Sequence, residues 1–481
     1  MSTLTRRIGI LGSARAINRL SLLLVAVLLS RLLDKADYGN FQYVLLIYRT
    51  AFPFLTIGIP ASILFFYVRL EGDAQLRFIW QTLECLGVLA LLGALIFFWG
   101  SEPFGRGVHR PEVIPLLRVF ALYVFSGVLV SFAEPLFISL NRQKLILGVS
   151  LISSSLALLL LWVLVSQTQS VYWALVGLGV AVSFKLVLFL SQTLRVLGKP
   201  HLGINIALLT RQLRYAVPVA LTEMVGILAH NTNALLVAAF FSATEFAIYS
   251  NGSFEIPFIG ILVSSVAAVV IPEFSQLLGR GDSATVRHIW HNGIRKLALI
   301  LFAVFAVFLV CAEDVMVLLF SESYRESAHY FRIFLLLIPL RALFVSSILL
   351  AAGHTKPIFY ASLGDLILNF LLGLWLVQHW GSTGPAWAVV ISTYLQVLVY
   401  LIWVCKALKV SFWQVLPFKS LLEIGGISGI AMLGGYAAGR YIESTLWHLA
   451  GCGTVTLLIF AGLWGLRSFL FRLSTSQDKP S

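Results

Sequence analysis

Residues 145–166 read LILGVSLISSSLALLLLWVLVS, a run of apolar and small residues without a charged side chain. Residues 171–194 continue with VYWALVGLGVAVSFKLVLFLSQTL, in which Lys185 is the one charged residue. A bilayer core of about 30 Å needs roughly 20 mainly apolar residues per helix, so each run is long enough to cross a membrane. The short polar segment between the runs predicts a turn joining two antiparallel membrane helices.

Similar runs fill the chain on both sides of this pair and predict an all-α polytopic membrane protein of about fourteen transmembrane helices. The predicted spans are 8–32, 39–67, 78–99, 114–138, 145–166, 171–194, 213–240, 246–272, 292–312, 328–352, 357–378, 383–405, 420–440 and 446–470. Of the 481 residues 59% are hydrophobic and 11% are charged. Soluble domains carry about a quarter charged residues, so this composition excludes an ordinary soluble protein.

The formal net charge of +13 comes mainly from basic residues in short loops between the apolar runs. Lys and Arg collect on the cytoplasmic side of membrane proteins. With both termini in the cytoplasm, most of the 34 Lys and Arg residues fall on that side, which predicts an inner-membrane protein with this orientation. The charge therefore indicates topology and not a nucleic-acid partner. No cleaved signal peptide is expected, because Arg15 and Arg19 interrupt the first run.

No motif indicates catalysis, a metal site or a bound cofactor. The four cysteines are scattered without paired spacing, at positions 85, 311, 405 and 452. Phosphate-loop, serine-hydrolase and zinc-protease patterns are absent, and no loop is long enough to fold as a separate domain. The expected activity is therefore transport and not an enzymatic reaction.

An internal duplication relates the two halves of the chain. Its matches keep an offset that drifts only from about 208 to 214 residues, and six predicted spans separate the copies. The matched segments are Asp37-Tyr38-Gly39 with Glu245-Phe246-Ala247, Arg77 and Trp80 with Arg287 and Trp290, 117–120 with 331–334, 141–144 with 353–356, Trp162 with Trp375, and Trp173 with Trp387. Repeats of equal topology are one of the arrangements found in secondary transporters.

The duplication predicts three parts. Residues 1–200 form an N-terminal six-helix half and residues 201–410 form a second, pseudo-symmetric half. Residues 411–481 add two transmembrane helices and a cytoplasmic tail. The glycine-rich run 425–439 in this last part is typical of close helix packing.

Polar residues inside the predicted spans concentrate on the first two spans of each half. An ionisable group at the bilayer centre costs at least a few kcal/mol and needs a partner or a watery cavity. The residues concerned are Arg15, Asn18 and Arg19 in the first span, Gln42 and Arg49 in the second, Glu223, His230, Asn231 and Asn233 in the seventh, and Asn251 and Glu255 in the eighth. Prolines 53, 60, 218 and 257 accompany them and predict kinks.

If the two halves face each other, these spans line a central chamber that holds three arginines. Guanidinium groups bind phosphate oxygens in a two-pronged geometry, so the chamber predicts a phosphate-bearing or otherwise anionic substrate. Candidate substrate-binding residues are Arg15, Asn18, Arg19, Gln42, Arg49 and Asn231. Candidate coupling residues are Glu223, His230 and Glu255.

A structural explanation of the same residues stays open at this point. Glu223 or Glu255 would neutralise Arg19, and the duplication places Arg15 opposite Glu223, which would leave interhelical ion pairs without a substrate role. For four further charged residues that stand alone on their spans, structural pairing is the favoured interpretation. These are Glu134, Lys185, Arg341 and Asp365.

The N-terminal region resembles a known family of membrane proteins. Its motifs are 15–20 (RAINRL), 28–33 (LLSRLL) and 37–41 (DYGNF). They are similar to the opening of polysaccharide-biosynthesis membrane proteins, the Wzx-type oligosaccharide flippases of the multidrug/oligosaccharidyl-lipid/polysaccharide (MOP) exporter superfamily. The overall plan of two six-helix halves is also similar, here with two additional helices.

The resemblance implies movement of an undecaprenyl-pyrophosphate-linked oligosaccharide between the leaflets of the inner membrane by alternating access, for O-antigen or exopolysaccharide assembly. By this resemblance, the residues expected to bind the pyrophosphate are Arg15, Arg19 and Arg49. Implied partners are this lipid, the bilayer and other polysaccharide-assembly proteins. No cofactor is implied, and an H⁺ gradient, an Na⁺ gradient or the membrane potential would supply the driving force.

Other functions remain as alternatives. An ion-coupled multidrug exporter or a lipid II-type flippase would have the same overall plan, although arginines do not suit organic cations. A membrane-embedded glycan polymerase or ligase would need a large catalytic loop. A scaffold subunit would have its intramembrane charges all paired.

Overall fold

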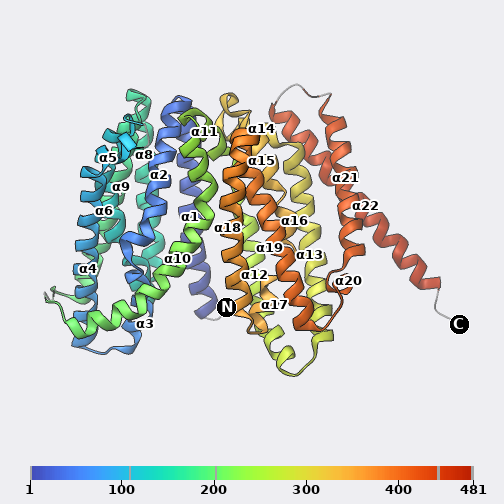
Figure 1. Cartoon of the computed structure of the whole chain (residues 1–481), viewed down its shortest axis with the longest axis horizontal. Helices are drawn as coiled ribbons and strands as arrows, with labels where there is room; N and C mark the ends of the chain where they lie inside the picture. The colour runs from blue at the N-terminus through green and yellow to red at the C-terminus, as the bar shows by residue number, and fades with distance from the viewer. Residues whose placement is uncertain (1–2, 108–109, 201–202, 441, 443–444, 478–481) are drawn as a thin grey trace. The chain divides into compact units, whose positions relative to one another are not determined.

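The computed structural model describes residues 3–107, 110–200, 203–440, 442 and 445–477, without the side chains of 3–9, 107, 257 and 468–477. The described residues form helices and contain no β-strand, which confirms the all-α fold class (Figure 1). They pack into two compact units, residues 1–247 and 248–481.

Unit 1 is a bundle of long helices and short connecting helices. Neighbours in the bundle include α4 with α6, α6 with α9, α8 with α9, and α1 with α8. Helix α10 packs on α2 and α3. The elements are α1 (Thr3–Leu32), α2 (Lys35–Thr56), α3 (Ile59–Phe66), η1 (Tyr67–Arg69), α4 (Asp73–Trp99), α5 (Ser101–Gly107), α6 (Val113–Val130), α7 (Ala133–Ser139), α8 (Gln143–Thr168), α9 (Val171–Leu197) and α10 (Ile206–Phe240). Helix α11 (Ala243–Gly252) crosses the boundary between the units.

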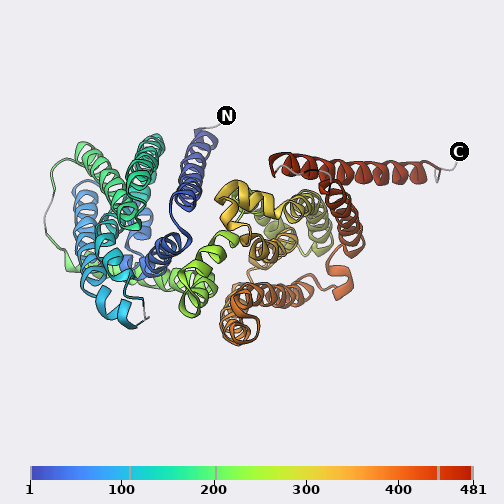
Figure 2. The same ribbon diagram turned by 90° about the horizontal axis from the view of Figure 1, so that it is seen from above.

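Unit 2 repeats much of this order and adds two helices. The pairs α18 with α19 and α21 with α22 pack along their length, and α13 contacts α21 and α22. Most helices of each unit are seen nearly end-on in Figure 2, whereas α22 is tilted away from its neighbours. The elements are α12 (Pro257–Gly279), α13 (Ser283–Val310), α14 (Ala312–Phe320), η2 (Glu322–Tyr324), α15 (Ser327–Leu335), α16 (Ile338–Arg341), α17 (Ser346–Ala351), α18 (Thr355–Trp380), η3 (Gly381–Thr383), α19 (Gly384–Leu408), α20 (Phe412–Val415), α21 (Phe418–Gly439) and α22 (Thr445–Gln477).

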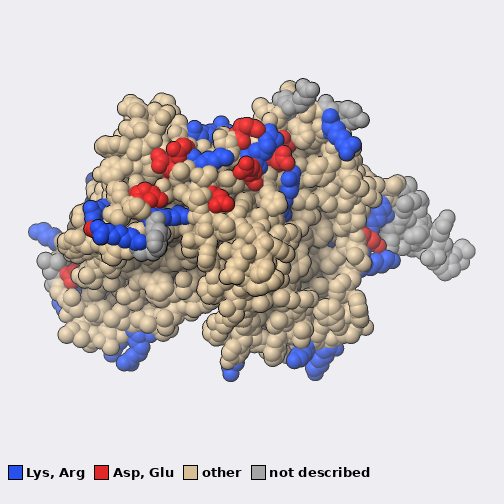
Figure 3. Space-filling view, turned by 45° about the horizontal axis from the view of Figure 1, so that its top comes forward, with Lys and Arg blue, Asp and Glu red and all other residues tan. Residues whose placement is uncertain are grey.

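Ten candidate membrane spans occur among the described residues, or eleven when the bent pair α2 and α3 is taken as one span. One of the ten, Thr355–Leu408, contains both α18 and α19. Each of the fourteen predicted runs coincides with a helix or with a series of short helices, so the predicted number of fourteen is consistent with the structure. Figure 3 shows charged side chains in a band across the upper part of the view and basic ones along its lower rim, with a broad surface of uncharged residues between them.

Four predicted spans are broken helices and not continuous ones, which corrects the sequence prediction. They are 39–67 (α2 and α3), 114–138 (α6 and α7), 246–272 (α11 and α12) and 328–352 (α15 to α17). Proline begins or nearly begins several of the later pieces, because it cannot donate the backbone hydrogen bond that would continue the preceding helix. The breaks fall in the second and fourth predicted spans of each half, so they belong to the repeat.

The repeat also preserves an ion pair near one end of each copy. In unit 1, Arg118 of α6 lies 3.2 Å from Glu102 of α5, and in unit 2, Arg332 of α15 lies 3.0 Å from Glu313 of α14. The arginines are matched at an offset of 214 residues and the glutamates at 211. In each copy the pair joins the short helix after the third span to the start of the fourth.

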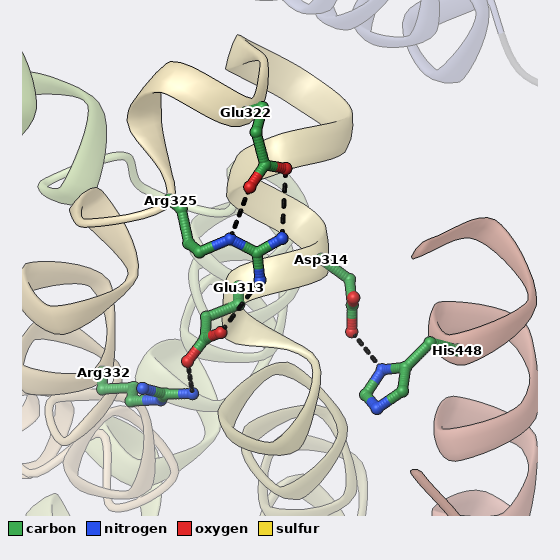
Figure 4. A network of polar contacts seen from close by, with 6 residues as sticks. All are labelled: Glu313, Asp314, Glu322, Arg325, Arg332 and His448. Carbon is green, nitrogen blue, oxygen red and sulfur yellow. Dashed lines mark hydrogen bonds and ion pairs between the residues drawn. The ribbon is translucent and has the colours of Figure 1, made fainter. Parts of the chain in front are cut away.

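Glu313 belongs to a larger polar network that ties α22 to the rest of unit 2 (Figure 4). Arg325 lies 3.2 Å from Glu313 and 2.7 Å from Glu322. The neighbouring Asp314 points the other way, and its carboxylate lies 2.6 Å from His448 Nδ1 on α22.

The glycine-rich helix α21 packs closely against α22, as its sequence predicts. A Cβ atom on Gly435 would lie 2.1 Å from Thr456 Oγ1, and one on Gly434 would lie 2.2 Å from Ile459 Cδ1. Small residues at such an interface allow the two backbones to approach each other.

We predict that Gly435→Ala destabilises the protein by about 1–3 kcal/mol, because the added methyl overpacks the contact with Thr456. Gly429→Ala in the same helix is the matched control, since a Cβ there meets no atom within 4 Å. Alanine is also the better helix former, by about 1 kcal/mol. Thermal unfolding of the purified protein in detergent checks both variants, and equal midpoints for the two would refute the packing argument.

The polar network predicts a loss of stability in acid. Burial raises the pKa of Glu313, but hydrogen bonds and the charges of Arg332 and Arg325 outweigh burial and lower this pKa below its ordinary value of 4.5. A lowered pKa in the folded state means that the stabilisation is present above 4.5 and is lost as the pH falls through the folded-state value.

We therefore expect Glu313→Gln to flatten the fall of the melting temperature below pH 4.5, because the substituted side chain has no proton to gain. Melting curves of the wild type and the variant across this range measure the effect. If the two proteins lose stability in parallel, Glu313 does not contribute to the acid sensitivity.

Candidate functional site

Unit 1 contains a partly open cavity of about 760 Å³. Ligand sites in proteins commonly have volumes of about 300–1,000 Å³, so this cavity has the size of a binding site. Its walls come from α1, α2, α3, α6, α7, α8, α9 and α10. Its polar and charged lining residues include Arg15, Asn18, Arg49, Ser131, Glu134, Lys185, Glu223, His230 and Asn231.

The break between α2 and α3 shapes one wall of the cavity. The two helices meet at an angle of 47°, and Ile57 and Gly58 between them both have left-handed backbone conformations. At Gly58 the φ angle is +66°, and a Cβ atom would lie 2.5 Å from the carbonyl oxygen of Ala216 on α10. Glycine is thus required by both conformation and space. Gly58 and Pro60 line the cavity, as expected of irregular backbone within a membrane protein.

Arg15 forms an ion pair inside the cavity with Glu134 of α7. Its Nε and Nη2 atoms lie 2.9 and 2.7 Å from the same carboxylate oxygen, Oε1 of Glu134. The side chains keep 62% and 39% of their surface exposed, so water or another anion can reach both. Glu134 also interacts electrostatically with Lys185 of α9. The pairing differs from the predicted opposition of Arg15 and Glu223.

Arg49 of α2 is a cavity-lining arginine without such a partner. Among the described residues, no carboxylate lies within ion-pair distance of its guanidinium, whereas nine other ion pairs are found. Its surroundings are aromatic: Tyr48, Phe52 and Tyr123 also line the cavity. The rings of Tyr48 and Tyr123 pack edge to face at 5.1 Å, and the Arg49 charge acts on the phenol of Tyr123.

Asn231 connects α10 to the helix that carries Arg49. Its Nδ2 atom donates a hydrogen bond of 3.0 Å to Oγ1 of Thr50, the residue after Arg49. Glu223 and His230 line the cavity from the same helix. The structure therefore brings six of the nine candidate site residues together: Arg15, Asn18, Arg49, Glu223, His230 and Asn231.

The other three candidates lie elsewhere. Gln42 donates a hydrogen bond of 2.6 Å to the hydroxyl of Tyr38 and is not among the lining residues. Arg19 is exposed outside the cavity lining. Glu255 belongs to unit 2, where its carboxylate lies 2.8 Å from Arg341 of α16.

The cavity lining also includes residues outside the predicted site. Structural pairing is the predicted role of Glu134 and Lys185, and Glu134 does pair with Arg15 while both residues line the cavity. Tyr48 and Tyr123 are not among the predicted site residues. Glu134 lies beside Pro135 at the start of the short helix α7, and a carboxylate at a proline break within an apolar run would have been a usable signal.

The described lining residues carry three permanently basic groups and two carboxylates. With Arg15 held by Glu134, the Arg49 guanidinium is the group best placed to receive an anion. Among the described residues, no group of His, Cys, Asp and Glu side chains has the arrangement of a metal site. The cavity is therefore suited to a ligand that combines an anionic head with surfaces for aromatic contact.

Comparison with known proteins identifies a similar sequence and matching family models. The chain is 22% identical to the capsular polysaccharide biosynthesis protein CapF of Staphylococcus aureus, over 80% of this chain and 96% of the relative. A family model described as lipid II flippase MurJ matches residues 231–450.

Solved structures share the fold. A lipid II flippase MurJ in an inward closed conformation superposes with a TM-score of 0.75 at 16% identity, covering 96% of this chain and 99% of the other. An inward-facing MATE-family multidrug resistance transporter of the MOP superfamily gives a TM-score of 0.66 at 15% identity, covering 82% and 95%. The fold is therefore that of MOP-type transporters.

A family model described as polysaccharide biosynthesis protein matches residues 28–329, which is more than half of the chain. This match includes α2 to α10, from which most of the cavity is built. It also confirms the resemblance found in the N-terminal motifs. The chain belongs to the polysaccharide biosynthesis protein family, a group of multi-pass membrane transporters and not of enzymes.

Proposed function

We propose that the protein is a flippase that moves an undecaprenyl-pyrophosphate-linked oligosaccharide from the cytoplasmic to the periplasmic leaflet of the bacterial inner membrane. The observation that carries this proposal is Arg49, a guanidinium that lines a cavity of about 760 Å³ and has no carboxylate partner among the described residues. Arginine binds phosphate through paired hydrogen bonds, and the aromatic walls offer stacking surfaces to sugar rings.

In this mechanism, Arg49 makes the first contact with the pyrophosphate. Arg15 becomes a second contact when the phosphate displaces Glu134 from it. An exposed ion pair contributes only about 0.2–1 kcal/mol, so exchange of one anion for another is energetically inexpensive. Lys185 and Glu134 would then form a pair of their own, which keeps the charges of the cavity balanced.

Glu223 and His230 are the proposed coupling groups, because both line the same cavity on α10. A carboxylate and an imidazole that change protonation would alter the charge around the bound pyrophosphate. An H⁺ gradient, an Na⁺ gradient or the membrane potential would drive the cycle. Arg19, Gln42 and Glu255 have no direct contact with the substrate in this proposal.

The orientation proposed here has both termini in the cytoplasm, on the basis of the distribution of Lys and Arg. The two repeat halves, 1–200 and 201–410, would rock against each other in alternating access. Residues 411–481 would support this movement without forming part of the repeat.

The direct test is leaflet translocation in proteoliposomes that contain an undecaprenyl-pyrophosphate oligosaccharide. We predict that Arg49→Ala weakens substrate affinity roughly 10- to 100-fold, as expected for the loss of a charged hydrogen-bonded contact. Arg49→Lys should lie between the wild type and Arg49→Ala, because an ammonium keeps the charge but not the two-pronged geometry.

Arg19→Ala is the matched control, an arginine of a neighbouring helix outside the cavity lining, and it should transport like the wild type. If Arg49→Ala transports the lipid as well as the wild type does, Arg49 is not part of the binding site. Transport of an organic cation in place of the lipid would favour a multidrug exporter.

Release of Arg15 from its carboxylate gives a second test. We predict that Glu134→Gln strengthens substrate binding roughly two- to five-fold, because the anion that competes for Arg15 is gone. The concentration dependence of translocation measures this change. Unchanged affinity together with unchanged stability would show that the substrate does not exchange with Glu134.

A further inference from the structure

A second pocket lies in unit 2, far along the chain from the transport cavity. It has a volume of about 680 Å³ and is formed by the first turns of α13, by α20 and by the start of α21. These elements meet at the lower end of unit 2 in Figure 1. The pocket shares no lining residue with the cavity of unit 1.

Basic side chains dominate its lining. Arg287, His291 and Arg295 follow one another at intervals of four on α13 and therefore share a face of the helix. His288 lies beside them, and Lys419 faces the pocket from α21. No acidic residue is among the described lining residues, and none of these cations has a carboxylate within ion-pair distance in the described part of the chain.

The cluster is held in place despite the repulsion among its charges. His291 Nε2 donates a hydrogen bond of 2.9 Å to the carbonyl oxygen of Val415 in α20, while the charges of Arg287 and Arg295 act on the same ring. His288 is engaged by Asn292 at 3.0 Å. Two acids lie near the cluster along the chain. Asp282 caps α13 by accepting a hydrogen bond from the backbone N–H of Thr285, and Glu423, one turn after Lys419, pairs with Arg467 of α22. An anion in the pocket would relieve this repulsion.

The repeat shows that the fold does not require these charges. At an offset of 210 residues, Gln81 corresponds to His291. Gln81 accepts a hydrogen bond of 2.9 Å from the backbone N–H of Asn205, so at this position both units join the long helix to the backbone of the segment after the sixth span.

Only one of the basic residues on α13 is repeated. The positions that correspond to Arg287, His288 and Arg295 are Arg77, Phe78 and Cys85. Unit 1 thus makes the same contact between a long helix and the segment after the sixth span with one basic residue in place of the cluster. The additional charge in unit 2 is therefore not needed for this contact.

Aromatic side chains at the pocket indicate where it lies relative to lipid. Trp413 lines the pocket and is 78% exposed, and its ring packs at 5.7 Å from that of Phe418. Tryptophan is enriched at the depth of the lipid headgroups, because one side of the ring is apolar and the N–H is polar. The pocket therefore has an exposed tryptophan beside a cluster of basic side chains, at the end of a membrane helix.

We infer that this pocket binds the phosphate headgroup of an anionic membrane phospholipid. Basic pockets at the ends of membrane helices recognise such headgroups, and arginine binds phosphate in a two-pronged geometry. The lipid would dock between α13 and α21, and Trp413 would lie beside its glycerol region. The same chemistry would accept free inorganic phosphate, but the exposed tryptophan favours the membrane-bound source. The inference is independent of the proposed transport function.

The test uses the full-length protein purified in a neutral detergent, with retained lipid counted by native mass spectrometry. We expect the wild type to retain phosphatidylglycerol in preference to phosphatidylcholine. The triple variant Arg287→Gln, Arg295→Gln, Lys419→Gln should bind phosphatidylglycerol on the order of a hundredfold more weakly, since each basic residue contributes a similar share. Lys296→Gln is the matched control, an exposed lysine next to Arg295 that does not line the pocket.

Two further measurements separate the outcomes. Quenching of Trp413 fluorescence by brominated phosphatidylglycerol, compared with Trp413→Phe, should be present in the wild type and lost in the triple variant. Equal retention of phosphatidylglycerol by the wild type and a folded triple variant would overturn the inference. Competition by inorganic phosphate without selective lipid retention would also overturn it, because the ligand would then be a soluble anion.

Discussion

An ionised side chain inside a membrane needs either an opposite charge or access to water, and this requirement organises unit 1 around its cavity. Arg15 is placed where Glu134 can reach it, and Lys185 lies within the influence of the same carboxylate. Arg49 has no such acid among the described residues and opens onto the cavity with Tyr48 and Tyr123. The cationic groups therefore face a cavity that eight helices of the unit, including α10, line.

The broken helices follow from a related requirement. A backbone group that leaves a helix within the membrane must find another partner or face a cavity. The break at Ile57 and Gly58 does the latter, and the close approach of α10 at Ala216 makes glycine necessary there. The break between α6 and α7 contributes Ser131 and Glu134 to the same space. Irregular backbone and charged side chains thus occur together, since both depend on the cavity.

The repeat separates what the architecture needs from what function adds. Both copies keep the ion pair that joins the short helix after the third span to the fourth, Glu102 with Arg118 and Glu313 with Arg332. In both, the residue at Gln81 or His291 also makes a hydrogen bond to the backbone of the segment after the sixth span. The charges near these positions differ between the copies, since the basic pocket of unit 2 has only one matching arginine in unit 1. A duplicated scaffold has therefore been given different chemistry in each half.

The sequence by itself determined the membrane class, the all-α fold and the family, and it predicts an internal repeat. These properties depend on hydrophobic length, local motifs and composition, which are readable without knowledge of the contacts between helices. It also selected the polar residues of the first, second and seventh spans, and six of the nine candidates line one cavity. Only the tertiary structure decided which charges are paired, because Arg15 with Glu134 and Arg341 with Glu255 join residues 119 and 86 positions apart. Helix packing brings such residues together, and no periodicity along the chain encodes the partner or the space left between the helices.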